Sequence, residues 1–309
     1  MSDWWVKVDK TLRHHAQGGV QALRALAWPL LRQPAAPVFV VGCSRAGTTL
    51  VYKTLSESPE LGSLQRETHD YWAGLHPPSE TGWQTHAIAP EQANPDEANR
   101  VARDFFVGTG RHHWVDKNNQ NGLSVPYLLG LFPRARFVYV KRAPGDNINS
   151  LIEGWNKPEE FATWSDRLPG SVAIDGGRIQ RWCFFLAAGW EALRAAPLAQ
   201  VAAFQYRAMN DAILSAREAV PASQWAEVHY EDLVTDPVEE FRRLFRDCAL
   251  EFDAATEHHC RRVLERPYNA FSPIGLEKWR SGPHAPAIEA VLPEVGAVAG
   301  RMGYPADAA

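Results

Sequence analysis

Residues 37–49 read Pro-Val-Phe-Val-Val-Gly-Cys-Ser-Arg-Ala-Gly-Thr-Thr, and this stretch decides the fold. Its first five residues are a short apolar run of β-branched and aromatic type, which is typical of a buried parallel strand. Gly42 and Gly47 then allow a tight turn whose successive N–H groups point at an anion. A helix expected from about Gly47 to Ser56 adds the positive end of its dipole. The stretch therefore predicts a phosphate-binding loop, although a tight turn without a ligand would use the same residues.

Similar apolar runs and amphipathic stretches alternate along the rest of the chain. Further strands are expected at 113–116, 136–141 and 226–230, with a weaker candidate at 61–65. Helices are expected at 96–107, 122–131, 145–154, 178–195, 203–219, 237–248, 254–265 and 285–301. Strands that alternate with helices predict an α/β fold of three layers, P-loop-like, in which helices flank a central parallel sheet.

The length of 309 residues suits one large domain over 1–309. Residues 1–36 are expected to form a helical lead-in, partly basic and amphipathic. For this lead-in, packing on the domain is the simpler interpretation and a helix at a membrane surface is the alternative. The stretch from about 155 to 222 contains no strand candidate, and it is expected to be a helical insertion over the sheet.

Composition excludes several classes of protein. Apolar residues make up 45% and charged residues 22% of the chain, so a buried core is expected rather than disorder. The net charge of −4 argues against a nucleic-acid partner. The four cysteines form no Cys-x-x-Cys pair, which predicts reduced thiols. No run approaches the roughly 18 apolar residues of a membrane span. The start of the chain also lacks a signal-peptide core, so a cytoplasmic location is expected.

The predicted phosphate loop lacks the lysine of an ATP-binding loop. Thr48 stands where the motif G-x-x-x-x-G-K-[ST] has its lysine, and the nearest cation is Arg45. The strand at 136–140 is followed by Lys141 and Arg142, where a metal-binding Asp would follow in a P-loop NTPase. A basic residue there attracts an anion and repels a metal. We therefore expect a nucleotide with phosphate at two places and no metal.

A second phosphate contact is expected just after this strand. Pro144 suits the first turn of a helix, and Asp146 favours the same helix end. Ser150 then lies about one turn further on. Arg142 at the strand end and Ser150 on the helix are both within reach of one phosphate. Read alone, they would more simply be a surface Arg and a solvated Ser, but beside the lysine-free loop the phosphate contact is favoured.

These motifs resemble those of the PAPS-dependent sulfotransferases, which use 3′-phosphoadenosine 5′-phosphosulfate (PAPS). Gly42-x-x-Arg45-x-Gly47-Thr48-Thr49 is similar to their 5′-phosphosulfate loop, and Arg142-x-Pro144-x-Asp146-x-x-x-Ser150 to their 3′-phosphate motif. The segments 228–237 and 272–280 resemble the late strand and the C-terminal loop of the family. The chain departs from the pattern at Ala46, where Ser is usual, and at Ala143, where Asp is frequent. The resemblance implies that the nucleotide, released as adenosine 3′,5′-bisphosphate (PAP), is bound by Arg45, Ala46, Gly47, Thr48, Thr49, Arg142 and Ser150, with weaker contacts from Tyr230, Lys278 and Arg280.

Sulfuryl transfer needs a base for the acceptor and positive charge at the leaving oxygen. Glu67 lies 22 residues after Arg45, at the expected carboxyl end of the sheet, and its Glu-Thr pair resembles the base of the tyrosylprotein branch of the family. His69 is the alternative base, since histidine serves in the cytosolic small-molecule branch. Lys117, in a turn that resembles the Asn-Lys-Asp turn of the tyrosylprotein branch, is expected to stabilise the leaving oxygen together with Arg45. A salt bridge of Glu67 to Arg66 and a solvated Lys117 are the structural alternatives.

Two other functions remain as alternatives. A small-molecule P-loop kinase would need the missing lysine and Asp, and a non-catalytic nucleotide-binding protein would not need Glu67 and Lys117. The adjacent histidines at 14–15, 112–113 and 258–259 point to different sides of their elements, so no metal site is expected. The acceptor is expected to be a small molecule, a carbohydrate or a lipid-linked compound, with aromatic residues of 71–83 lining its pocket.

Overall fold

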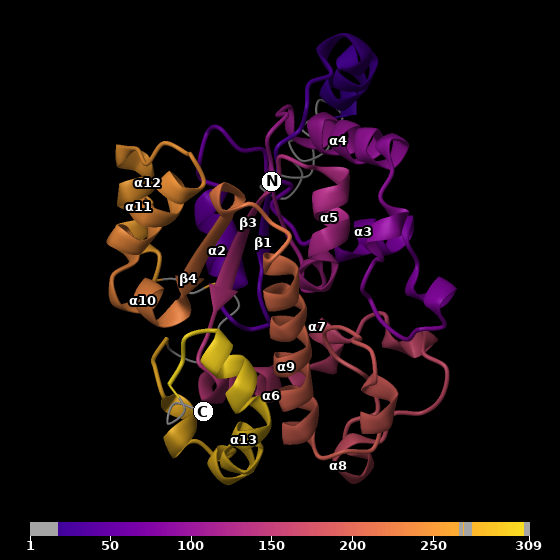
Figure 1. The fold of residues 1–309 in the computed structure, drawn as a ribbon, viewed down its shortest axis with the longest axis vertical. Helices are drawn as coiled ribbons and strands as arrows, with labels where there is room; N and C mark the ends of the chain where they lie inside the picture. The colour runs from indigo at the N-terminus through magenta and orange to yellow at the C-terminus, as the bar shows by residue number, and fades with distance from the viewer. Residues whose placement is uncertain (1–17, 266–267, 269–273, 306–309) are drawn as a thin grey trace, which may run out of the picture.

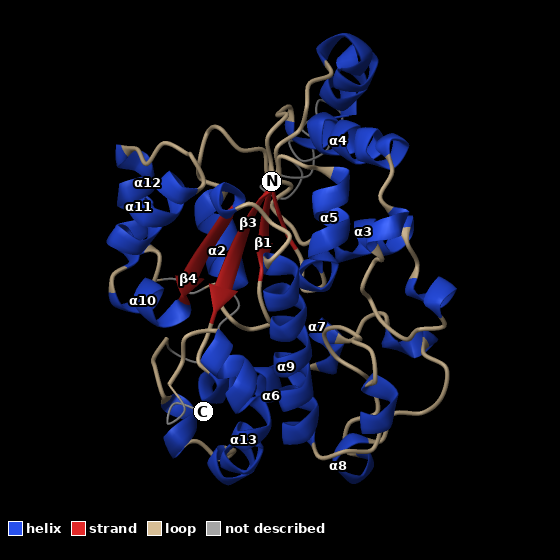
Figure 2. Ribbon diagram, viewed as in Figure 1, coloured by secondary structure: helices blue, strands red, loops and turns tan. Residues whose placement is uncertain are grey.

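The fold is organised around one parallel sheet, seen in a computed structural model that describes residues 18–265, 268 and 274–305. Its strands are β1 (Val38–Val41), β2 (Val115–Lys117), β3 (Arg136–Lys141) and β4 (Trp225–His229), in the order β2-β1-β3-β4. Val40 pairs with Lys117 on one side and with Val138 on the other. The predicted α/β class with a central parallel sheet is confirmed (Figures 1 and 2).

Helices cover both faces of this sheet (Figure 2). They are α2 (Thr48–Leu55), α3 (His69–Leu75), α4 (Pro95–Thr109), α5 (Val125–Leu131), α6 (Pro144–Trp155), α7 (Pro158–Phe161), α8 (Ile174–Gly177), α9 (Leu198–Arg217), α10 (Tyr230–Thr235), α11 (Pro237–Asp247), α12 (Ala254–Arg262) and α13 (Ala285–Arg301). Residues 18–31 form a further helix before β1, and residues 1–17 of the predicted lead-in lie outside the described residues.

Alternate residues of the strands supply two separate cores, because successive side chains of a strand point to opposite faces. Phe39, Val41 and Tyr139 belong to a core shared with α4, α5, α6, α9 and α13. Val38 and Val40 belong to a second core shared with α2, α11 and α12. The four cysteines divide in the same way, with Cys43 and Cys183 in the first core and Cys248 and Cys260 in the second.

One predicted helix is wrong. Residues 178–195 contain a single short 3-10 turn (Trp190–Leu193) and are otherwise irregular. The buried Gln205 side chain of α9 explains how this chain avoids a helix. Its Nε2 donates hydrogen bonds of 3.0 Å to the carbonyls of Cys183 and Phe185, which helical bonds would otherwise satisfy. The apolar run therefore crosses the core as an irregular segment, with Phe184 in the left-handed region at a φ of 67°.

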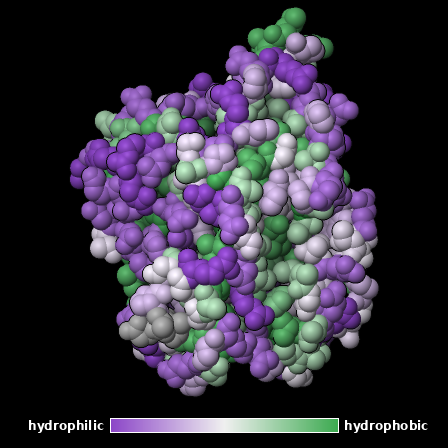
Figure 3. Space-filling model, in the orientation of Figure 1, coloured by the Kyte–Doolittle hydropathy of each residue, from purple (hydrophilic) through white to green (hydrophobic). Residues whose placement is uncertain are grey.

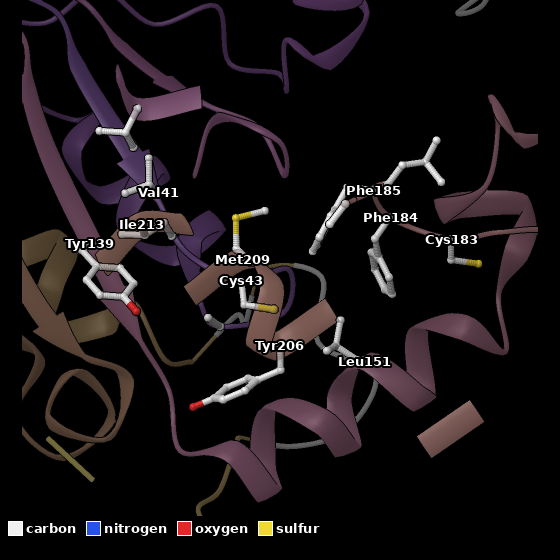
Figure 4. Close-up of a cluster of buried hydrophobic side chains, with 14 of the residues drawn as sticks. Val41, Cys43, Tyr139, Leu151, Cys183, Phe184, Phe185, Tyr206, Met209 and Ile213 are labelled. Atoms are coloured by element: carbon white, nitrogen blue, oxygen red, sulfur yellow. The ribbon is translucent and has the colours of Figure 1, made fainter. Parts of the chain in front are cut away.

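The predicted insertion over 155–222 has one helix longer than a single turn, α9. This helix packs against α6 and α13 and contributes to the first core, on one face of the sheet. Figure 4 shows Tyr206, Met209 and Ile213 of α9 between strand residues and the segment that contains Phe184. The weak strand candidate at 61–65 is reduced to one bridge between Gly62 and Trp114. The other predicted strands and helices are present, with ends shifted by a few residues.

Candidate functional site

The carboxyl ends of β1, β2 and β3 open onto one pocket. In a parallel sheet these ends lie at the same edge, where ligands of α/β proteins bind. The pocket is lined by residues of the β1–α2 loop, by Lys117 after β2, by Arg142 after β3 and by Tyr230 of α10. Segments far apart in the sequence thus face one another across this edge.

The β1–α2 loop has the backbone of a phosphate cradle. A Cβ atom at Gly42 would lie 2.6 Å from the Val140 oxygen, so only glycine fits. Gly47 begins α2 at a φ of 100°, and a Cβ there would lie 2.5 Å from the Tyr230 ring. Arg45 is also left-handed, with a φ of 68°. The backbone N–H groups at the start of α2 are therefore free of a capping side chain at Gly47 and are available to an anion.

Arg142 and Ser150 meet the loop from the other side. Arg142 Nη1 donates a 2.8 Å hydrogen bond to the Arg45 carbonyl, and its guanidinium lies 4.3 Å from the centre of the Tyr230 ring. Arg45 Nε donates to Ser150 Oγ at 3.3 Å. Burial and the neighbouring charge of Arg142 lower the pKa of Arg45 to about 10. The two predicted phosphate motifs thus lie in direct contact.

Three buried polar atoms of this pocket have no hydrogen-bond partner among the described residues. They are Ser44 Oγ, Asn119 Oδ1 and Arg142 Nε, and all three residues line the pocket. Buried polar groups are nearly always paired in folded proteins, by protein, water or ligand. A donor such as Arg142 Nε, beside backbone N–H groups, suits the oxygens of a phosphate.

Glu67 and Lys117 form an ion pair next to the loop. Lys117 Nζ lies 2.6 Å from Glu67 Oε1 and 3.2 Å from Thr49 Oγ1. The Lys117 side chain is 6% exposed and that of Glu67 35%, so the carboxylate is the part open to the pocket. Burial raises the pKa of Glu67, but Lys117, with smaller contributions from His69 and Arg45, lowers it below its ordinary value. Glu67 is therefore a carboxylate at neutral pH.

A buried carboxylate, Asp116, holds both members of this pair from behind. It accepts hydrogen bonds from Thr68 Oγ1 at 2.6 Å, Trp72 Nε1 at 3.0 Å and Asn121 Nδ2 at 3.0 Å. Thr68 follows Glu67 in the chain, and Asp116 precedes Lys117. The buried Asp116 therefore joins the segment that contains Glu67 to the strand that contains Lys117.

The remaining predicted residues lie at varying distances from the pocket. Lys278 lines it, because Glu277 N donates to Asp146 Oδ2 at 2.7 Å and Trp279 packs on Gly145 of α6. Arg280 does not line it, and its Nε lies 3.4 Å from Glu277. Ala46 and Thr48 are buried in the loop.

Two basic or titratable residues near the pocket are not among the residues that line it. His69 lies 3.3 Å from Asp70 and is not among the lining residues. Lys141, expected to attract an anion, instead pairs with Glu227 of β4. The sequence predicts Lys141 after a strand at 136–140, but Lys141 is the last residue of β3 and its side chain reaches toward the neighbouring strand β4.

Several lining residues were missed from the sequence. Asn119, Asn149, Glu153, Phe161 and Phe184 share no motif, and two of them come from the segment predicted as an insertion. Asn119 Nδ2 donates to the Phe184 carbonyl at 3.0 Å, which holds this segment over the pocket. Only the run of polar residues after β2 could have indicated Asn119. Within the described residues, no group of three metal-ligating side chains occurs, and no helix has the length and hydrophobicity to cross a membrane.

The chain is similar to known proteins over most of its length. A family model described as "Sulfotransferase family" matches residues 37–254. Sulfotransferase STF9 from Mycobacterium avium is similar in structure, with a TM-score of 0.58 at 16% identity over 93% of this chain and 82% of that chain. The sulfotransferase domain of the Synechococcus PCC 7002 olefin synthase has a TM-score of 0.49 at 18% identity, over 89% of this chain and 97% of that chain. The likeness to STF9 indicates a shared fold. No curated protein sequence matches this chain significantly.

Proposed function

The chain belongs to the sulfotransferase family, and on that premise we propose that it transfers the sulfuryl group of PAPS to a hydroxyl or amine acceptor. Glu67 is the general base in this proposal, and Lys117 and Arg45 neutralise the leaving oxygen. The observation that supports it most is the ion pair of Glu67 and Lys117, 2.6 Å long, beside Thr49 at the start of the phosphate loop. A base and a cation at one place are what in-line transfer requires.

Each residue of the pair has one task in the transfer. Glu67 takes the proton of the acceptor as its oxygen or nitrogen bonds to sulfur. The bridging bond from sulfur to the 5′-phosphate oxygen breaks, and Lys117 and Arg45 stabilise the negative charge that develops on that oxygen. When Lys117 turns its charge to this oxygen, Glu67 loses the partner that lowers its pKa while its burial remains. Its basicity therefore rises when the acceptor is deprotonated.

The nucleotide would be held by residues of both motifs. PAPS supplies the activated sulfuryl group. The loop from Arg45 to Thr49 offers N–H groups and hydroxyls for the 5′ end, and Arg142 with Ser150 offers a cation and a hydroxyl for the 3′-phosphate. The unpaired Arg142 Nε and Ser44 Oγ support this placement, since a phosphate would give them partners. Tyr230 and Lys278 complete the proposed contacts.

The acceptor side is partly apolar. Phe161 and Phe184 line it, with ring centres 4.9 Å apart, and Asn119 adds a polar contact. We propose a small-molecule, carbohydrate or lipid-linked acceptor, because aromatic walls stack on rings and cover apolar chains.

The first experiment is calorimetric titration with PAP, beside ATP and 5′-AMP, in the presence of EDTA. We expect tight binding of the bisphosphate only, because two phosphate sites act together without a metal. Preference for ATP, or binding that needs Mg²⁺, would contradict the proposal and favour a kinase.

Transfer itself is tested with radiolabelled PAPS and a panel of phenols, sugars and lipid-linked alcohols. Glu67→Gln should abolish transfer and keep PAP binding, whereas His69→Gln should keep both. Full transfer by Glu67→Gln would remove Glu67 as the base. Tight PAP binding without transfer to any acceptor would favour the non-catalytic alternative.

A further inference from the structure

The helix at residues 18–31 presents an apolar face to solvent. Leu23, Leu26 and Leu30 are 68%, 78% and 89% exposed. Val20 and Leu31, on the same side of the helix, are also exposed, whereas elsewhere in the described residues only Tyr268 and Leu276 are large exposed apolar residues. In Figure 3 the helix is the green projection at the top of the molecule. Scattered apolar residues are normal on a surface, but a contiguous group marks an interaction site.

The opposite face of this helix is fixed to the domain. Trp28 is buried, packs against Phe106 with ring centres 5.5 Å apart, and donates from Nε1 to Asn99 at 3.3 Å. Arg24 Nη1 donates to the Val107 carbonyl at 3.2 Å. The leucines therefore point outward because the helix is anchored through its other side.

A groove at the foot of the helix is also apolar, and it carries positive charge. It encloses about 650 Å³ between the helix, α4 and α5, and it is lined by apolar side chains such as Trp28, Leu131 and Phe132. Two exposed arginines, Arg32 and Arg134, also line it, and no described Asp or Glu does so. An apolar groove with cations and no carboxylate suits an amphiphile with an anionic head.

Positive charge is concentrated in and next to this helix, as an anionic partner would require. Residues 18–33 contain Arg24 and Arg32 and no Asp or Glu, a net charge of +2 in a chain whose net charge is −4. The other residues together therefore have a net charge of −6. Such an asymmetry attracts this helix to an anionic surface and repels the remainder of the molecule from it.

We propose that the exposed leucine side of residues 20–31, together with Arg32 and Arg134 of the groove at the foot of the helix, docks on an anionic lipid surface. The helix lies in the plane of the membrane with Leu23, Leu26 and Leu30 at the acyl boundary, and the arginines meet headgroup phosphates. This docking needs no membrane-spanning segment. It is also independent of the proposed function, because the helix lies at the amino-terminal edge of the sheet, opposite the edge where the strands end at the pocket (Figure 1).

A second copy of the chain suits this face less well. The described part of this helix, residues 18–31, is about 21 Å long and roughly 10 Å wide, so its apolar stripe covers far less than the roughly 800 Å² per partner of a stable interface. A two-fold dimer would also bring the arginines of both copies to one interface. A lipid surface has neither restriction.

The test is co-sedimentation of the full chain with vesicles of phosphatidylcholine alone and of phosphatidylcholine mixed with phosphatidylglycerol. We expect binding to the mixed vesicles only, weakened by salt. Leu26→Ser with Leu30→Ser should weaken binding at least about tenfold, because both side chains lose apolar burial. Arg32→Gln with Arg134→Gln should weaken it about fivefold for each charge.

A matched control makes the same charge change elsewhere. Arg246→Gln with Arg262→Gln, exposed residues at the ends of α11 and α12, should leave vesicle binding unchanged. All variants should bind PAP as the parent chain does, which separates this proposal from the proposed function. Unchanged vesicle binding by the leucine variant would overturn the proposal. Failure of the parent chain to bind mixed vesicles would also overturn it. In that case, ultracentrifugation shows whether the chain is a monomer or forms a dimer that the leucine variant abolishes.

Discussion

The two sides of the pocket are held in different ways. On the phosphate-loop side, the main chain sets the geometry, and Gly42 and Gly47 occupy positions where a single methyl group would clash. On the Glu67 side, side chains distant in sequence set the geometry, since Asp116 ties the segment of Glu67 to the strand of Lys117. The first side depends on residues close together in the chain, and the second on a buried hydrogen-bond network. Variants should therefore separate nucleotide binding from turnover.

Replacing Lys117, the cation on the Glu67 side of the pocket, should have the largest effect on turnover. Lys117→Met removes the charge beside Thr49 and leaves Glu67 without its partner. We expect kcat to fall by about 10²–10³-fold, the usual loss for a group that stabilises a developing oxyanion. Single-turnover transfer from radiolabelled PAPS measures this, with PAP affinity by calorimetry as the comparison. A fall in PAP affinity as large as the fall in kcat would place Lys117 with the nucleotide instead.

On the first side, Arg142→Ala should weaken PAP binding rather than turnover. A charged hydrogen bond contributes about 1.5–3 kcal/mol, so the Kd should rise roughly 10- to 150-fold. Part of this loss comes from the loop itself, because Arg142 also holds the Arg45 carbonyl. Arg246→Ala is the matched control, since Arg246 is exposed and does not line the pocket. Equal affinities for the two variants would remove Arg142 from the nucleotide site.

The network behind the pair should affect turnover more moderately. Asp116→Asn keeps the shape of the side chain and removes its charge, and we expect kcat to fall about tenfold, because small displacements of catalytic groups are costly. PAP affinity should not change. Glu97→Gln is the control, since Glu97 is another buried carboxylate, bonded to His76 at 2.8 Å and not among the residues that line the pocket. Both variants should lose stability, but only Asp116→Asn should lose turnover. Equal kcat losses would give Asp116 a structural role only.

The smallest effect concerns pH. Lys117 lowers the pKa of Glu67, so the base stays ionised as the pH falls and the acid limb of kcat/KM should lie at lower pH than for an ordinary carboxylate. Lys117→Met should shift this limb to higher pH, because burial alone raises the pKa. The same carboxylate stabilises the fold above its unfolded pKa, and this contribution is lost as the pH falls through the lowered value. An acid limb unmoved by Lys117→Met would contradict the coupling.

The contrast between the two sides also explains what could be predicted from the sequence. Gly42 to Thr49 and Arg142 to Ser150 form local motifs, and the structure places them in contact. The Asp116 network joins residues 48 positions apart through side chains of ordinary type, which no spacing rule identifies. A helix is predicted at 178–195, but the Gln205 side chain satisfies the carbonyls of Cys183 and Phe185 in this segment. Side-chain hydrogen bonds over long range are thus what local patterns missed.

The burial of every cysteine has a practical consequence. Burial raises the pKa of all four thiols, and none is accessible in the folded chain. A thiol reagent can therefore label them only after local opening. The labelling rates of Cys43 and Cys183 would measure the opening of the core that contains α6 and α9. Those of Cys248 and Cys260 would measure the opening of the core that contains α2, α11 and α12. The labelling rates of the native cysteines thus report separately on the opening of the two cores, one on each face of the sheet. Cys43 also reports on the phosphate loop, in which it lies.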